Sequence, residues 1–181
     1  MANRTYLLEA KSPIPWQGEF PEKDILVAAN NSIPIFWYAL FQNDCIIARD
    51  CKLEDGTNVS YPYLVSTIED ARRRCLARRN SLLQVFPQSF SSTFDAFHDF
   101  LASVTSTHIH LDPLELWMMD EPEKFLPHVK RCVAAVERPD DTSREWGELL
   151  DQVQIDPNDI ASTTESYMLA GYSWERPVTW E

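Results

Sequence analysis

The longest run of helical periodicity covers residues 66–86, STIEDARRRCLARRNSLLQVF, which contains neither glycine nor proline. Apolar residues recur there at spacings of three and four, which places them on one stripe of a helix. Ser66 or Thr67 is a suitable N-cap, and Pro87 ends the run. The stripe consists of Ile68, Ala71, Cys75, Leu76, Leu82, Leu83 and Phe86. This pattern predicts a long helix that organises the rest of the chain.

The remaining apolar patterns predict shorter elements. Residues 33–41, IPIFWYALF, are apolar on every side, which is typical of a buried helix. Amphipathic helices are also predicted at 92–104, 121–137 and 142–150, and short strands at 4–9, 45–48 and 107–111. Core positions expected in the short helix are Phe36, Trp37, Leu40 and Phe41.

Two further segments leave their assignment open. Residues 24–30 form either a helical turn or a strand, because seven residues with a continuous apolar run do not distinguish the two. Val59–Leu64 could pair back across the Asp55-Gly56 turn, and Pro62 then favours the edge of a sheet.

Together the elements predict an α+β fold, as one compact domain over residues 1–181. We expect it to be predominantly helical around the long central helix, with a small, mostly antiparallel sheet. The aromatic end of the chain, from about 161 to 181, is expected to form an extended C-terminal arm that packs on the body or contributes a binding surface.

Composition narrows the cellular setting. The chain is 44% apolar and 12% aromatic, which is typical of a folded protein, and its apolar runs fall short of the roughly 20 residues of a membrane span. The N-terminus has no signal-peptide pattern, so a cytoplasmic location is expected. The four cysteines form no CxxC pair, which favours reduced thiols over a metal or redox motif.

The net charge of −12 argues against nucleic acid or an anionic membrane as a partner. Acidic residues concentrate in residues 137–181, which contain eleven acidic and three basic residues. Such a surface is either a solvated face or a docking site for a basic protein. The arginines of residues 72–79 are expected to pair with carboxylates of the same chain.

One group of residues could carry chemistry. On a strand His108, His110 and Asp112 face the same side, so they could bind a metal as in a metal-dependent hydrolase. The plainer interpretation is a strand whose polar side happens to be histidine. With four glycines and no GxSxG motif, neither a phosphate-binding loop nor a nucleophile elbow is predicted. No catalytic residue and no cofactor is expected.

Three segments carry a resemblance to a known family: MANRTYLLEA at the start, IPIFWYALF, and GYSWERPVTWE at the end. They resemble small bacterial immunity proteins encoded beside polymorphic toxins of the type VI secretion or Rhs type. The resemblance implies a cytoplasmic protein that binds a cognate secreted toxin and masks its active site. It implies no enzymatic activity and no active-site residues.

For such a protein the acidic C-terminal quarter is the expected partner-binding surface, facing a toxin with a basic cleft. The candidate residues are Asp140, Asp141, Glu145, Glu148, Asp151, Asp156, Asp159, Trp174 and Trp180. Two alternatives remain open, a metal-dependent hydrolase that uses the histidine cluster and a non-catalytic adaptor with a cellular partner.

Overall fold

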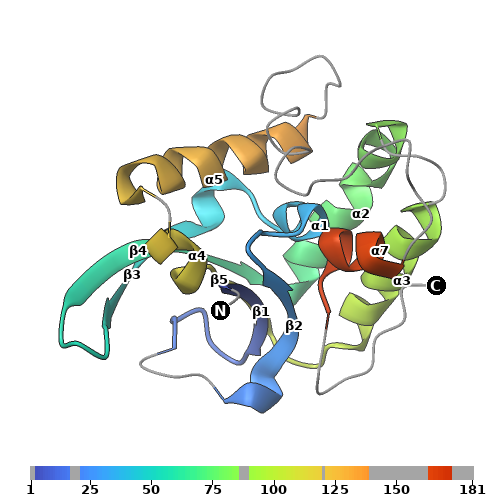
Figure 1. Cartoon of the computed structure of the whole chain (residues 1–181). Coiled ribbons are helices and arrows are strands. Elements are labelled where there is room, and N and C mark those ends of the chain that lie inside the picture. Colours follow the sequence, from blue (N-terminus) through green and yellow to red (C-terminus); the bar gives the residue numbers. More distant parts are fainter. Residues whose placement is uncertain (1–2, 17–20, 86–89, 120, 139–162, 173–181) are drawn as a thin grey trace.

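The computed structural model describes residues 3–16, 21–85, 90–119, 121–138 and 163–172 (Figure 1). The strands are β1 (Arg4–Ala10), β2 (Ile25–Asn30), β3 (Ile46–Lys52), β4 (Asn58–Thr67) and β5 (His108–Asp112). The helices are α1 (Ile35–Tyr38), α2 (Ile68–Val85), α3 (Phe90–Ser103), α4 (Leu114–Met119), α5 (Pro122–Glu137) and α7 (Thr163–Ala170).

A five-stranded antiparallel sheet in the order β2-β1-β5-β4-β3 organises these elements. The prediction of a predominantly helical domain around a long central helix is therefore wrong. The helix of 18 residues exists as α2, but it flanks the sheet instead of forming its centre. The central strand is β5, which inserts between β1 and β4 and pairs Leu7 with Leu111. Pairing across such a sequence separation leaves no trace in local periodicity.

The strand β4 shows how proline fits into this sheet. Pro62 lies opposite Ala48 of β3, whereas β5 pairs with β4 from Leu64 to Thr67. At Pro62 the strand thus has a neighbour on one side, so the missing N–H does not interrupt a ladder on the other. The prediction that Pro62 confines this strand to an edge is wrong, and the edge position belongs to β3.

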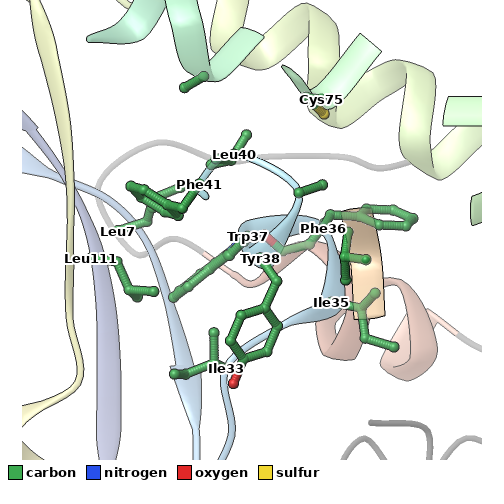
Figure 2. Packing of buried hydrophobic residues seen from close by; sticks show 14 of the residues in the cluster. Leu7, Ile33, Ile35, Phe36, Trp37, Tyr38, Leu40, Phe41, Cys75 and Leu111 are labelled. Carbon is green, nitrogen blue, oxygen red and sulfur yellow. Dashed lines mark hydrogen bonds between the residues drawn. The ribbon is translucent and has the colours of Figure 1, made fainter. Parts of the chain in front are cut away.

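One apolar core joins the sheet to α1, α2, α3, α5 and α7, and the short segment around α1 lies at its centre (Figure 2). The helix is confined to Ile35–Tyr38, shorter than the predicted 33–41. Its burial is confirmed, because all four of the predicted core side chains are inaccessible to solvent. Aromatic packing stabilises this core, because the ring centroids of Phe36 and Phe94 lie 5.1 Å apart in an edge-to-face arrangement.

Helix α2 fits against this segment partly through its arginines. Arg73 and Arg79 pair with Asp70 and Asp95, as predicted for the arginine cluster. Arg78 also pairs with a carboxylate, that of Glu137 at 3.8 Å. In addition it is buried and donates hydrogen bonds to backbone carbonyl groups that follow α1. Leu76, expected in the apolar stripe, is 55% exposed.

The described end of the chain packs on the body. Trp37 Nε1 donates to the carbonyl of Ala170 over 2.9 Å, and Gly171 ends α7 with a φ of 85°. A Cβ on Gly171 would lie 2.6 Å from the Trp37 ring, so glycine is required both by the backbone and by the space. Tyr172 then pairs with Ala28 at the outer edge of β2.

Candidate functional site

The His108–Asp112 strand is the natural starting point, because it holds the residues predicted to carry chemistry. Ile109 and Leu111 belong to the apolar core, and the alternating side chains of His110 and Asp112 lie on the opposite face of the sheet. Both polar side chains are nearly inaccessible, at 0% and 2% exposure. The same-face prediction is right, but the polar face of this strand is buried.

Asp112 is held by groups from three other elements. Its carboxylate forms an ion pair with Arg49 of β3, and the hydroxyl of Tyr61 on β4 donates to it over 3.0 Å. The backbone N–H of Leu114 also donates over 3.0 Å, so Asp112 caps α4. Burial raises the pKa of Asp112, and the Arg49 guanidinium opposes that shift. Its oxygens are thus occupied by structural partners.

Both ring nitrogens of His110 also have hydrogen-bond partners. Its Nε2 lies 2.9 Å from the carbonyl oxygen of Ser12, which can only accept, so Nε2 carries the proton. The Tyr63 hydroxyl then donates to Nδ1 over 3.1 Å. Burial lowers the pKa of His110 to about 4, although the Ser12 carbonyl opposes the shift. The ring is neutral and joins the segment before residue 17 to the sheet.

We name these five side chains, Arg49, Tyr61, Tyr63, His110 and Asp112, the polar cluster. The two tyrosine rings also flank the guanidinium, whose carbon lies 5.6 and 5.1 Å from their centroids. Burial is the largest cause that raises the pKa values of both tyrosines. The ion pair and the hydrogen bonds within the polar cluster join β3, β4 and β5, so they fix the relative positions of these strands.

This geometry bears on the metal alternative. Nδ1 of the half-buried His108 lies 2.9 Å from the Thr107 hydroxyl, and both nitrogens of His110 are in hydrogen bonds. Within the described residues no group of three or more potential ligands is placed to hold a metal ion. A metal would have to displace the partners of His110 and Asp112. The hydrolase alternative stays a prediction, and metal analysis of the purified protein checks it.

His110 should make the stability of the fold depend on pH. Its pKa in the folded protein is below the usual 6.5, so folding favours the neutral ring. This contribution is complete above about pH 6.5 and is lost as the pH falls towards 4, at up to about 1.4 kcal/mol per pH unit. Urea unfolding at pH 7 and pH 5 measures it.

The variant His110→Gln removes the titration. We expect a weaker pH dependence between pH 7 and 5 for His110→Gln than for the wild type. An unchanged slope in His110→Gln would contradict the assignment of a buried neutral ring.

A groove of about 460 Å³ adjoins the polar cluster. One wall comes from the β3–β4 hairpin, with Ile46, Ala48 and Pro62, and the other includes Leu126 of α5. Tyr61 and Trp117 also line it, with ring centroids 5.9 Å apart. Because Tyr61 anchors its hydroxyl in the polar cluster, this part of the groove has a rigid backing.

Apolar surface continues beyond Trp117 along α4. Met118 and Met119 are 54% and 61% exposed, and Ile47 on β3 is 37% exposed. Methionine side chains adapt to different partners, which makes them common at binding surfaces. Glu123 and Lys130 of α5 also line the groove, which together with these side chains forms a largely apolar surface of the kind that binds another molecule.

The predicted partner-binding residues lie elsewhere in the chain. Asp140, Asp141, Glu145, Glu148, Asp151, Asp156, Asp159, Trp174 and Trp180 all fall outside the described residues. Their role therefore stays a prediction. The structure instead places Trp117 and Tyr61 in the groove and Arg49 in the polar cluster, and the sequence analysis identified none of the three. The sequence signal for them was an arginine in a short strand, followed on the next strand by the alternating Tyr61 and Tyr63.

Within the described parts of the chain, no helix combines the length and apolarity that crossing a bilayer requires. Comparison with protein-family models, curated proteins and solved structures finds no match to this chain. The resemblance to immunity proteins accordingly stays a prediction.

Proposed function

We propose that this chain is a non-catalytic immunity protein that binds a cationic protein toxin and masks its active site. The observation that carries the proposal is the groove between the β3–β4 hairpin and α5, with Trp117 in its lining and exposed Met118 and Met119 beside it in sequence. Aromatic side chains in such surfaces supply much of the binding energy of protein complexes.

Charge supports the nature of the partner. A chain of net charge −12 attracts cationic proteins and accelerates their association. Toxins that act on nucleic acids or nucleotides need cationic clefts for these substrates, and an acidic protein can cover such a cleft. The type VI or Rhs-type association is part of the same proposal and rests on the family resemblance.

The polar cluster supports binding over catalysis. A general acid or base must reach its substrate, whereas His110 and Asp112 are buried and hydrogen-bonded to Tyr63, Ser12, Arg49 and Tyr61. In the proposed function these groups maintain the shape of the sheet behind the groove. The protein then needs only a stable surface, without a cofactor.

Co-purification with the product of the adjacent gene, together with rescue of cells that express that product, tests the proposal. We expect Trp117→Ala to weaken binding by about 10–100-fold, because it removes the large aromatic side chain from the groove. Leu76→Ala on α2 is the control, since Leu76 is exposed and lies outside the groove. Binding should also weaken as salt is raised.

The outcomes separate the alternatives. Absence of both binding and rescue by the wild-type protein would reject the immunity function. Capture of a housekeeping protein without rescue would indicate the adaptor. Wild-type affinity in a folded Trp117→Ala variant would exclude the groove as the binding surface while leaving the function in place.

A further inference from the structure

The two edges of the sheet are treated differently. At the edge formed by β2, Tyr172 makes an antiparallel bridge with Ala28, with N–H to carbonyl distances of 2.7 and 2.9 Å. At the opposite edge, β3 has β4 as a neighbour on one side, and no strand in the described parts of the chain pairs with its other side. Figure 1 shows β3 as the outermost strand, with the β3–β4 hairpin projecting from the body.

Strand β3 lacks two of the features that usually keep an edge from pairing, a bulge and a proline. Its register with β4 runs without a bulge from Ile46 opposite Leu64 to Lys52 opposite Asn58. The strand contains no proline, and its lysine stands at the last position. Natural sheets also block edges with charged side chains that point inward, and Arg49 is such a side chain, but its charge is paired with Asp112 inside the sheet. A regular strand of 7 residues without a bulge or a proline is a suitable template for another strand.

Charge indicates what could pair there. In the described segment 44–55 the side chains of Asp44, Asp50, Glu54 and Asp55 are exposed. Arg49 is 4% exposed and forms its ion pair with Asp112, so its charge is neutralised inside the sheet. Lys52 remains as the exposed basic residue of this segment. A second copy of the chain would bring two acidic segments together, whereas a basic strand would be attracted.

The groove supplies room for the side chains of such a strand. Ile46, Ile47 and Ala48 of β3 all line the groove. Ile46 and Ala48 share one face of the strand, and Arg49, on the other face with Ile47, points into the polar cluster. Alternate side chains of a strand added to β3 would lie on the same face as Ile46 and Ala48. Backbone hydrogen bonds then provide affinity, and the groove provides selectivity.

We propose that β3 is an open docking edge, to which the partner adds an extended basic segment as a sixth strand beside the groove. This inference rests on the proposed function, since it names how the cationic toxin is held. It assigns the main contact to the described β3 edge, separately from the acidic residues after 138.

The test uses the wild-type protein and a defined probe, a capped nine-residue peptide of alternating lysine and valine. Amide hydrogen exchange and backbone NMR shifts report the contact. We expect slower exchange and shifted signals for Ile46–Lys52 on addition of this peptide. A peptide with glutamate in place of lysine, and one N-methylated at every residue, should leave these signals unchanged, because they lack the charge or the backbone donors.

A paired set of variants tests the same edge with the product of the adjacent gene. Ile47→Lys/Asp50→Lys places positive charge on the edge and should weaken binding at least 10-fold. Leu76→Lys/Asp99→Lys makes the same charge change on the exposed surface of α2 and α3 and should retain wild-type binding. Thermal unfolding of both variants verifies that each is folded.

The outcomes distinguish this inference from the proposed function. Suppose that the wild-type protein captures the gene product, that the β3 amides exchange as fast as in the free protein, and that the Ile47→Lys/Asp50→Lys variant binds with wild-type affinity. The docking edge is then rejected and the proposed function stands. If the basic peptide protects β3 but the gene product does not bind, the edge stands and the function fails. Dimerisation with β3 protection in the absence of peptide would assign the edge to a second copy and overturn the inference.

Discussion

Replacing Asp112 with alanine is expected to lower the free energy of unfolding by about 3–5 kcal/mol, because it leaves Arg49 charged and buried without its carboxylate. Tyr61 loses its acceptor and α4 loses its N-cap in the same change. For a chain of this size the loss corresponds to a fall in Tm of about 6–20 °C. Urea and thermal unfolding monitored by circular dichroism measure it.

Two variants show that burial of the pair causes the effect. Asp70→Ala removes a carboxylate from an ion pair with Arg73, whose side chain is 74% exposed, and should cost less than about 1 kcal/mol. Arg49→Met in the Asp112→Ala background removes the stranded charge and should restore part of the lost stability. If Asp112→Ala costs no more than Asp70→Ala, the polar cluster does not maintain the sheet in the way argued above.

Local patterns predicted the elements better than their arrangement. The caps and periodicity of residues 66–86 correctly identified α2, because a helix is built from contacts three and four residues apart. The pairing of β1 with β5 joins Tyr6 to Asp112, so its partner could not be found by local reasoning. For this reason the sheet, and not the helix, was the organising element that the sequence analysis missed.

The candidate site shows the same division. Alternation along residues 107–112 correctly placed His110 and Asp112 on one face. It could not show that Arg49 and the carbonyl of Ser12 meet them there, because these partners come from distant segments. The groove is also formed by distant segments, with Trp117 opposite the β3–β4 hairpin. Charge composition predicted a cationic partner, whereas the surface proposed for it could not be identified without the topology.

The two edges of the sheet differ in their capacity to pair with another strand. Tyr172 bridges the β2 edge, whereas the β3 edge is regular and has acidic surroundings. Another strand is therefore expected to pair at β3 and not at β2. The ion pair between Arg49 and Asp112 holds β3 in its position relative to β5. Asp112→Ala should therefore lower both the stability of the fold and the affinity for a partner bound at β3. Variants on α2 should lower stability alone.

Arg78→Met is the second substitution with a large expected effect, about 3–5 kcal/mol, because several backbone carbonyls depend on one buried guanidinium. Its Nη1 lies 2.9 and 2.6 Å from the carbonyl oxygens of Ala39 and Phe41, where α1 ends inside the apolar core. Methionine preserves much of the apolar packing but donates no hydrogen bond.

The matched control is Arg73→Met at an earlier position on α2, where the side chain is 74% exposed and the cost should stay below about 1 kcal/mol. Urea unfolding gives both values, and hydrogen exchange should show faster opening of residues 35–41 in Arg78→Met. Equal stability of the two variants would mean that water replaces the guanidinium at these carbonyls. The predicted difference instead makes Arg78 the link between α2 and the buried aromatic segment, so the arginine-rich helix stabilises the core through its basic side as well as its apolar one.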